Sequence, residues 1–343
     1  MPIINGKYKN PGWTNNQPPA INSTELNAIS DTLEQLDAQP QSELGITWTP
    51  IQEINGIRSV ERLGYGNGRF WGAGITGASA TNRTLLYTDE NGDWKTISLP
   101  SSDAWYYAFY GDGKYFLTSL ASGSPIAVGN SLAVSTDLVT WEIRTLPIAR
   151  NWYAGIYGKG KFILISGRNS NIGLSSTDTV NWTQFTLPSS GTWCGIAYGM
   201  GMFVVVGADG SIAYSADGTT WKSSSIPGVR LQYITYGGDK FVATAENKEN
   251  LIYYSKDGVN WYTSTSPVTP NWSWGRVVYG GGKFLITSFS LNDEVKISLC
   301  SKNGIDWEVS ECPVDGGASI AYGDGKFIAL GGSTDTTFIT QSP

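Results

Sequence analysis

The chain has 343 residues with 42 Gly, 14 Trp and 18 Tyr, and only 15% of its residues are charged, against roughly 25% in ordinary soluble domains. Lys and Arg number 23 and Asp and Glu 29, giving a net charge of −6, so the general electrostatic attraction that nucleic-acid and anionic-membrane binding needs is missing. The chain has no His, which excludes His-based nucleophile systems and imidazole metal sites. The composition indicates a fold rich in turns and aromatic residues.

The three cysteines Cys194, Cys300 and Cys312 are odd in number and lack CxxC spacing, so we expect buried thiols. No window approaches roughly 18 consecutive apolar residues. The N-terminal run MPIINGKYKN has no apolar h-region typical of a signal peptide. We therefore expect no membrane insertion, no cofactor, no metal site and no export by the usual route.

Residues 1–40 are expected to form a separate N-terminal segment. Asn22-Ser-Thr-Glu25 has the pattern of a capping box, and Gln39-Pro40 is a stop signal. Between them, apolar residues follow a 3-4-3 spacing: Leu26, Ile29, Leu33 and Leu36. The pattern predicts a helix at about 23–37 with one apolar seam. Because so short a helix is marginal alone, we expect the seam to be buried against the rest of the chain, another copy or a partner protein.

The run Trp-x-Asn-x-x-Pro-Pro-Ala-Ile-Asn-x-x-Glu-Leu-Asn-x-Ile, from Trp13 to Ile29, resembles the N-terminal attachment segment of tail-fibre and baseplate proteins of phages and prophages of Gram-positive bacteria. The resemblance covers roughly residues 1–38. It implies a homotrimer docked to phage tail or baseplate proteins, with a C-terminal module that binds the host surface. It also implies a protein made in the host cytoplasm that acts extracellularly on the virion tail, and release by lysis would need no signal peptide.

A repeat fills the remainder of the chain. A Tyr-Gly turn recurs in steps of 38 to 47 residues, at Tyr65, Tyr110, Tyr157, Tyr198, Tyr236, Tyr279 and Tyr322. A tryptophan series runs in phase with it, at Trp48, Trp94, Trp141, Trp182, Trp221, Trp261 and Trp307. Units of this length match one four-stranded propeller blade. We expect an all-β fold, a seven-bladed β-propeller over residues 46–343.

Each unit shows four strand signals, which we name a to d in chain order. In the fifth unit these are LQYITYG, KFVATAE, LIYYSKDG and NWYTSTS, which are rich in β-branched and aromatic residues and separated by Gly or Asp-Gly turns. Pairs such as Asp217-Gly218 supply the positive φ that a tight c–d turn needs. The strand at 46–51 has no strands ahead of it, and the last unit ends after its c strand at 336–342. We expect these two strands to pair and close the ring.

The pattern Ser-x-Asp-Gly-x-x-Trp occurs at Ser215–Trp221 and Ser255–Trp261, with variants in four other units. It resembles the Asp-box repeat of sialidase-like propellers, although it is one residue shorter. In that family the box is a structural turn on the face opposite the active site, so the resemblance bears on fold more than on activity.

The two faces of the expected propeller differ. The a–b and c–d turns on one face are nearly constant, whereas the b–c segments on the other vary from Ala208–Gly210 to longer ones near Ala73–Arg83 and Ser119–Asn130. Variable loops favour a functional face. Its rim gathers aromatic rings that could stack on sugar C–H faces, and Arg and Asn side chains that could donate hydrogen bonds to hydroxyls or carboxylates. The candidate ligand-binding residues are Arg62, Trp105, Tyr107, Arg150, Asn151, Trp152, Trp193, Arg230, Tyr233, Asn271, Trp272, Trp274 and Arg276.

Several alternatives stay open. The rim tryptophans could instead wedge between blades. The leading hypothesis is a non-enzymatic tail protein that recognises a host cell-surface glycan. A sialidase-like glycoside hydrolase is the alternative, with Arg62, Arg230 and Arg276 as its arginine triad and Asp103 or Glu61 as its acid, but the Arg-Ile-Pro motif of that family is missing. A purely structural tail component is a third hypothesis.

Overall fold

The computed structural model describes residues 3–4, 7–8, 48–55, 57, 59–75, 84–101, 103–120, 129–246, 250–268, 273–289, 297–311, 319–332 and 336–342. The chain divides into two compact units, Met1–Glu43 and Leu44–Pro343. In the first unit, β1 (Ile3–Ile4) pairs antiparallel with β2 (Lys7–Tyr8). The helix expected at about 23–37, with Leu26, Ile29, Leu33 and Leu36, lies outside the described residues. The helical part of the expected fold is therefore not supported, and within the described ranges no helix could span a membrane.

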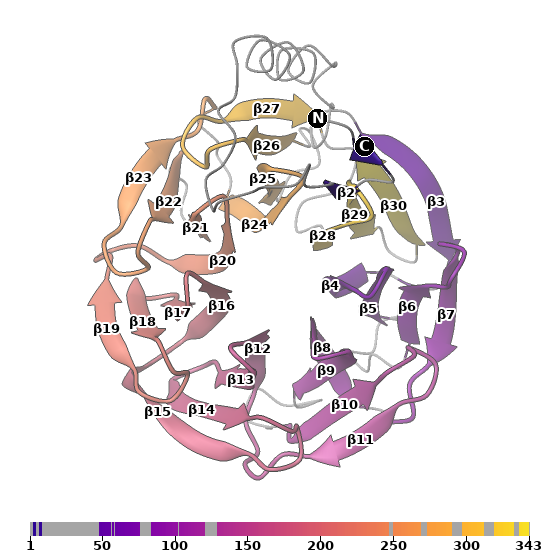
Figure 1. The fold of residues 1–343 in the computed structure, drawn as a ribbon, viewed down its shortest axis with the longest axis horizontal. Helices are drawn as coiled ribbons and strands as arrows, with labels where there is room; N and C mark the ends of the chain where they lie inside the picture. The colour runs from indigo at the N-terminus through magenta and orange to yellow at the C-terminus, as the bar shows by residue number, and fades with distance from the viewer. Residues whose placement is uncertain are drawn as a thin grey trace, which may run out of the picture. The chain divides into compact units, whose positions relative to one another are not determined.

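The unit Leu44–Pro343 is a ring of four-stranded antiparallel sheets that surround a central axis (Figure 1). Six sheets consist of four consecutive strands each. In chain order they are β4 (Ser59–Gly66), β5 (Arg69–Ile75), β6 (Thr84–Thr88) and β7 (Trp94–Ser98); β8 (Ala104–Gly111), β9 (Lys114–Leu120), β10 (Ser131–Ser135) and β11 (Glu142–Thr145); β12 (Trp152–Gly158), β13 (Lys161–Ser166), β14 (Ser170–Ser176) and β15 (Thr183–Gly191); β16 (Trp193–Gly199), β17 (Met202–Gly207), β18 (Ser211–Ser215) and β19 (Lys222–Ser225); β20 (Leu231–Gly237), β21 (Lys240–Ala245), β22 (Leu251–Ser255) and β23 (Tyr262–Thr265); and β24 (Ser273–Gly280), β25 (Lys283–Phe289), β26 (Ile297–Ser301) and β27 (Glu308–Glu311).

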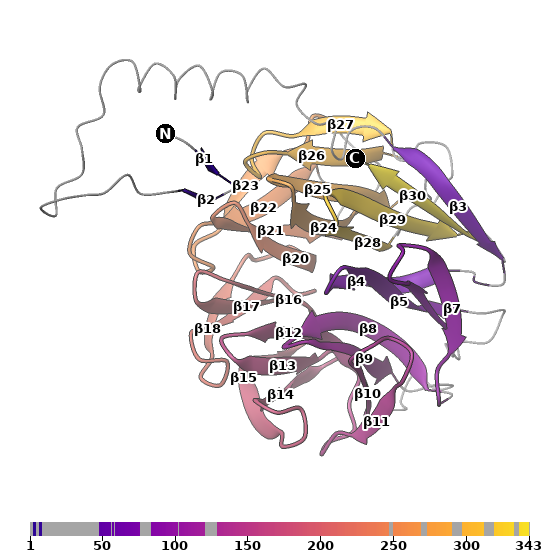
Figure 2. The ribbon, with the colours of Figure 1, turned by 45° about the vertical axis from the view of Figure 1, so that its right-hand side comes forward.

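One further sheet is composite and brings the four-stranded sheets of the described chain to seven. It joins β28 (Ser319–Gly323), β29 (Lys326–Gly332) and β30 (Thr336–Ser342) to β3 (Thr49–Asn55), which precedes all the other sheets in the chain. β3 pairs antiparallel with β30, from Thr49 opposite Gln341 to Asn55 opposite Thr336. The inner strands contact one another in the order β4, β8, β12, β16, β20, β24, β28 and back to β4 (Figure 2). The ring is therefore closed.

The boundary expected for the first strand, 46–51, is wrong because β3 runs from Thr49 to Asn55. The reason is the role of the tryptophan before it. In the sheet of β8 to β11 the corresponding tryptophan precedes the d strand, and the Nε1 of Trp141 donates to the Leu138 carbonyl of the c–d turn at 3.1 Å. Trp48 likewise stands just before its strand, and its Nε1 donates to Ser298 Oγ at 3.4 Å.

The Tyr-Gly repeat makes the contact between neighbouring sheets. The tyrosine of each inner strand packs on the Phe or Tyr opposite it across the hairpin, with ring centroids 4.5 to 5.0 Å apart. The glycine after it lies so close to the tyrosine ring of the next sheet that no Cβ would fit. The pairs are Gly66 with Tyr110, Gly111 with Tyr157, Gly158 with Tyr198, Gly199 with Tyr236, Gly237 with Tyr279, Gly280 with Tyr322, and Gly323 with Tyr65. The last pair closes the circle.

The hairpin that follows each Tyr-Gly pair has two residues with positive φ, as at Asn67 (48°) and Gly68 (74°). Two such residues match the right-handed twist of the strands, and Asn and Gly adopt this conformation at least cost. The c–d turns also need a positive φ, at Gly218 (74°) and Gly258 (74°), which confirms the role expected of the Asp-Gly pairs. The same conformation occurs at the non-glycine residues Leu138 (68°) and Thr179 (65°).

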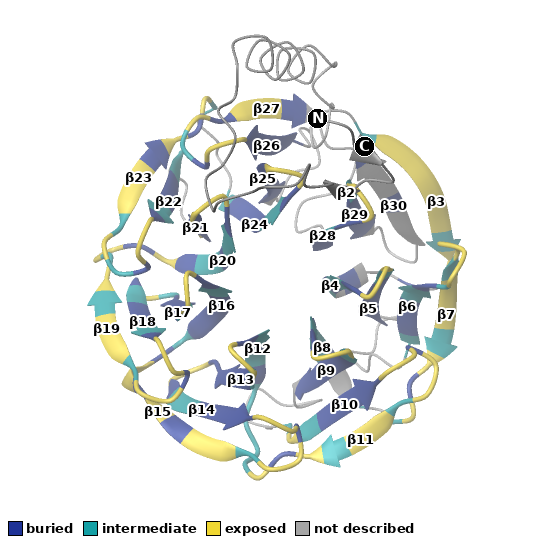
Figure 3. Cartoon of the chain, viewed as in Figure 1, coloured by how far each residue is buried: buried dark blue, intermediate teal, exposed yellow. Residues whose placement is uncertain are grey.

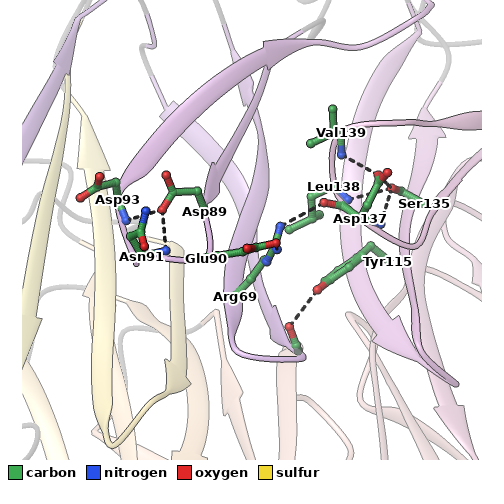
Figure 4. A network of polar contacts seen from close by, with 11 residues as sticks. Arg69, Asp89, Glu90, Asn91, Asp93, Tyr115, Ser135, Asp137, Leu138 and Val139 are labelled. Carbon is green, nitrogen blue, oxygen red and sulfur yellow. Dashed lines mark hydrogen bonds and ion pairs between the residues drawn. The ribbon is translucent and has the colours of Figure 1, made fainter.

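An aspartate caps several of the c–d turns. Asp137 Oδ1 accepts hydrogen bonds from the backbone N–H groups of Val139 and Thr140 at 2.8 and 2.7 Å, and Ser135 Oγ accepts one from Leu138 N at 2.9 Å. Arg69, just after an a–b turn, donates to the Asp137 carbonyl of the next sheet at 3.1 Å (Figure 4). The a–b and c–d turns therefore lie on one face of the ring.

The opposite face carries the b–c and d–a connections, which hydrogen-bond to each other. Gly167 N donates to the Asn151 carbonyl at 3.0 Å and Ala208 N to the Thr192 carbonyl at 2.8 Å. Between the faces, the side chains of adjacent sheets form buried clusters, and the outermost strands are largely exposed (Figure 3). One cluster joins Trp71 of β5 to Trp105, Tyr115 and Leu117 of the next sheet.

Candidate ligand-binding site

At the face with the b–c connections, the inner strands share an irregularity that the sequence does not show directly. Six inner strands, β4, β8, β12, β16, β20 and β24, have a register shift near their start. Each such β-bulge adds one residue and redirects the side chains beside it. Threonines of the preceding sheet hold two of the bulges, since Thr118 Oγ1 donates to the Trp152 carbonyl at 2.9 Å and Thr244 Oγ1 to the Gly275 carbonyl at 2.7 Å. The residue before, within and after the bulge therefore points to three different places.

The residue before the bulge points between the sheets. Trp105, Trp152, Trp193 and Trp274 occupy this position, and each is at most 1% exposed. Trp152 packs among Leu132, Leu146 and Phe162. A ring without an exposed face cannot stack on a ligand, so the structure places these four tryptophans in the core. This corrects the expectation of a ligand-binding role for them, because the bulge directs the side chain before it into the interface.

A second position points to the axis of the ring. It lies three residues before each Tyr of the Tyr-Gly repeat, within or just after the register shift of the six bulged strands and at the start of β28, and is occupied by Arg62, Tyr107, Ala154, Gly195, Tyr233, Arg276 and Ser319. All of them except Ala154 line one cavity of about 180 Å³, together with Thr235 and apolar side chains of the inner strands. Small residues at three of these positions leave room for the four large ones. These four were expected from the sequence as ligand-binding candidates, and the structure brings them together.

Two arginines and two tyrosines of this cavity are stacked. The guanidinium carbon of Arg62 lies 4.8 Å from the ring centroid of Tyr107 and 5.0 Å from that of Tyr233, which comes from a non-adjacent sheet. The guanidinium carbon of Arg276 lies 5.1 Å from the same Tyr233 ring. Arg276 is only 9% exposed. The arrangement attracts each cation to a ring face and places two positive charges at one small cavity.

Serine and threonine hydroxyls add polarity to the cavity wall. Ser319 Oγ accepts a hydrogen bond from Leu63 N at 2.5 Å, which ties β28 to β4. Among the described residues that line the cavity, none is an Asp or Glu. Asp103 lies elsewhere, where it accepts a hydrogen bond from Ser101 Oγ at 2.8 Å.

The bulge residues themselves form a second cluster, which was not among the residues expected from the sequence. The rings of Tyr106 and Tyr153, from adjacent sheets, lie 5.3 Å apart. Arg168 of the β13–β14 connection donates from Nε to Tyr153 Oη at 2.7 Å, and its guanidinium carbon lies 5.9 Å from the Tyr153 centroid. Arg168 and Asn169 both have positive φ, 55° and 53°, which makes a tight turn that exposes Arg168. We name Tyr106, Tyr153 and Arg168 the tyrosine–arginine cluster.

The signal for this cluster was present in the sequence. Tyr106 and Tyr153 each follow a buried tryptophan directly, so alternation along a regular strand predicts that they point away from it. The Tyr153 ring covers Gly167, where a Cβ would lie 2.7 Å from Tyr153 Cδ2. A glycine just before the turn therefore leaves the space that the Tyr153 ring occupies.

Of the other expected binding residues, those that the structure describes do not line the cavity. Arg230 is exposed and pairs with Glu246 at 3.3 Å, so it does not join Arg62 and Arg276 as a third cavity arginine. Arg150 and Asn151 are half-buried, and Arg150 donates to the Ala149 carbonyl at 3.1 Å. Asn271 and Trp272 lie outside the described residues.

A cysteine lies beside the cavity. Cys194 is the bulge residue of β16, is 8% exposed, and its Sγ donates to the Thr192 carbonyl at 3.2 Å. Burial raises the pKa of its thiol to about 11, although the positive charge of Arg62 acts in the opposite direction. This group is therefore a protonated thiol at neutral pH. In the described ranges no group of three or more His, Cys, Asp or Glu is placed to hold a metal.

Comparisons with known proteins bear on the fold. No protein-family model matches the sequence, and no curated protein matches it. Among solved structures, the chain is similar to one described as YCF48 bound to D1 peptide, with a TM-score of 0.63 and 15% sequence identity over 88% of this chain and 97% of that chain. At this identity the similarity shows the β-propeller fold alone.

Proposed function

We propose that this chain is a non-enzymatic receptor-binding protein of a phage tail or phage-tail-like particle, which recognises a host cell-surface glycan through the face with the b–c connections. The tail association rests on the N-terminal resemblance between Trp13 and Ile29. Partner tail proteins and a trimeric state belong to the same proposal.

The tyrosine–arginine cluster is the observation that supports recognition at this face. Tyr106 and Tyr153 are half-buried, so each keeps part of its ring accessible while its position is fixed by packing. Arg168 is exposed beside them and can donate hydrogen bonds to hydroxyl or carboxylate oxygens. Rings that combine stacking with hydrogen-bond donors suit a saccharide. The opposite face repeats the same capped turn in sheet after sheet, which is what a scaffold requires.

The test is binding of the labelled full chain to a panel of bacterial cells and purified cell-wall polysaccharides. Loss of one stacked ring costs roughly 1 to 3 kcal/mol by analogy with base stacking, so Tyr153→Ala should weaken binding about five- to 150-fold. Tyr262→Ala is the matched control, because Tyr262 is also one of a tyrosine pair, 5.7 Å from Tyr254, but lies directly after a c–d turn. Equal binding of the two folded variants, or no binding anywhere in the panel, would favour a structural tail component.

A sialidase-like hydrolase is the second candidate because Arg62 and Arg276 share one cavity. Against it, Arg230 lies elsewhere and no carboxylate is among the described lining residues, although such an enzyme needs an acid and a nucleophile within reach of the scissile bond. A fluorogenic sialoside assay separates the two candidates. Turnover that is lost in Arg276→Gln would replace the binding proposal with a catalytic one.

A further inference from the structure

The cavity at the axis of the ring concentrates positive charge in a chain whose net charge is −6. Arg62 reaches it from β4 and Arg276 from β24, and both guanidinium groups lie against the Tyr233 ring. A guanidinium stays protonated at every physiological pH. Two like charges at one partly desolvated site repel, and this repulsion is stronger in the protein than in water. A bound anion would offset it.

The lining groups also define which anion fits. Each guanidinium offers N–H donors in a planar fork that matches two oxygens of one group. The cavity adds the hydroxyls of Tyr107, Tyr233 and Thr235, each of which can donate one hydrogen bond. A ligand rich in acceptor oxygens, such as a carboxylate or a phosphate, can accept hydrogen bonds from groups of this kind, whereas an ammonium or an apolar group cannot.

The size of the cavity limits how much of a ligand enters. Its volume of about 180 Å³ exceeds the space of a single water molecule, yet it is below the roughly 300 to 1,000 Å³ of sites that enclose a whole drug-sized ligand. It therefore accommodates a charged group, while the remainder of a larger molecule stays outside.

We propose that the axial cavity is an oxyanion site that takes a carboxylate or phosphate group between Arg62 and Arg276. The inference rests on the proposed function in one respect, namely that the group belongs to an acidic surface polysaccharide. A free inorganic anion is the other source of the same chemistry, and the experiment separates the two.

Binding to the full chain is measured by calorimetry at low ionic strength, with inorganic phosphate, glucuronate and neutral glucose as probes and sodium chloride at matched ionic strength as background. Phosphate and glucuronate are expected to bind saturably and to compete with each other, and glucose is not. Arg62→Gln and Arg276→Gln should each weaken binding roughly 10- to 150-fold, the range for a hydrogen bond to a charged group. Arg69→Gln is the matched control, since Arg69 lies on the face of the c–d turns and pairs with Glu90 at 3.0 Å.

The proposal is overturned if the folded parent binds neither anion, if chloride displaces both equally, or if folded Arg62 and Arg276 variants keep the parental affinity. Should the glutamine variants not fold, Arg62→Lys and Arg276→Lys keep the charge and remove the fork, and parental affinity in both would also overturn it. The titration of the unmodified chain tests the proposal even if no variant folds.

The source of the group is tested with whole cells. If it belongs to a surface polysaccharide, saturating phosphate lowers binding of the chain to cells, and unchanged cell binding overturns this part of the proposal. Cell binding that needs Tyr153 in a chain that binds no anion would remove only the cavity inference. Anion binding by a chain that binds no cell would remove only the proposed function.

Discussion

Replacing Gly237 with Ala tests whether the Tyr-Gly contact holds neighbouring sheets in register. Gly237 ends β20, and its φ is not positive, so the backbone itself tolerates alanine. The added Cβ would meet Cγ, Cδ1 and Cβ of Tyr279 in the next sheet, with even the farthest of the three only 2.6 Å away. Real Cβ atoms keep at least 3.0 Å from such neighbours. The Tyr279 ring or the strand that holds it must therefore move by roughly 1 Å or more, which packed interiors resist.

The expected cost is about 2 to 3 kcal/mol, the upper part of the range for overpacking. Tyr279 cannot simply rotate away, because its ring already packs on Phe284 at 4.7 Å. The assay is urea unfolding followed by tryptophan fluorescence, with Gly191→Ala as the control. At Gly191 the nearest atom to an added Cβ would be Asp209 Oδ2 at 3.4 Å, an ordinary contact, and no positive φ is involved.

A double-mutant cycle separates this clash from general damage. Tyr279→Ala alone loses a large packed ring, at roughly 3 kcal/mol. In its background Gly237→Ala should cost distinctly less than in the parent, because Cγ and Cδ1 of the ring are gone and only the Cβ of residue 279, at 2.6 Å, remains close. The contact explanation is refuted if the two substitutions are additive within about 0.5 kcal/mol, or if Gly237→Ala costs no more than Gly191→Ala.

Three further outcomes follow from the described residues. Trp152→Ala should destabilise the fold by about 3 to 5 kcal/mol in urea, since its ring is buried; a fully stable variant would show that the ring does not pack as the structure has it. Burial raises the pKa of Asp257, but hydrogen bonds from Asn260 and Val259 outweigh it and hold the pKa at about 2, below the roughly 3.9 of an unfolded chain. Its stabilising effect is therefore complete above about pH 4 and lost as the pH falls through 2, so Asp257→Asn should show a smaller loss of stability between pH 5 and 2 in acid unfolding. Finally, Cys194 should resist alkylation by iodoacetamide at pH 8 in the native chain, measured by peptide mapping, because its thiol pKa is about 11; rapid labelling would contradict its burial.

One c–d turn of the chain already has asparagine, Asn303, at the position that Asp257 occupies in its own turn. It occupies the aspartate position of its c–d turn, and its Oδ1 accepts hydrogen bonds from Ile305 and Asp306 N at 2.9 and 2.8 Å. The geometry of the turn thus needs an acceptor oxygen rather than a charge. This equivalence explains why the turn pattern is recognisable in the sequence even where the residue changes.

The repeat made much of the fold predictable because its residues make contacts that recur from unit to unit. A tyrosine packs across its own hairpin, a glycine accepts the next tyrosine, and an aspartate caps a turn. The first and third contacts depend on neighbours a few residues away, and the second recurs at the same place between every two adjacent sheets. Strand limits were less predictable, and β3 shows why, since only the structure shows that this strand begins after Trp48 and extends to Asn55.

The site was less predictable because it depends on the β-bulges. Without a bulge, residues at alternate positions share one side of a strand, so Trp105 and Tyr107 would point the same way, as would Trp274 and Arg276. The extra residue breaks this alternation, buries Trp105 and Trp274, and turns Tyr107 and Arg276 toward the axis. Sequence spacing could therefore select the right segment and still misplace the tryptophans within it.

The same bulges connect the two candidate surfaces. Tyr106 lies within a bulge and belongs to the tyrosine–arginine cluster, and Tyr107 follows it and lines the axial cavity. A change of one residue in the length of this bulge would therefore alter which side chains point to the tyrosine–arginine cluster and which to the axial cavity. Deletion of Tyr106 should restore strict alternation in β8, so that the chain loses both the Tyr106–Tyr153 contact and the stack of Arg62 on Tyr107. Tyr106→Ala keeps the bulge and removes only the first. If the deletion weakens glycan binding no more than Tyr106→Ala, and leaves anion binding intact, the bulge does not position the cavity residues and the link between the two surfaces is wrong.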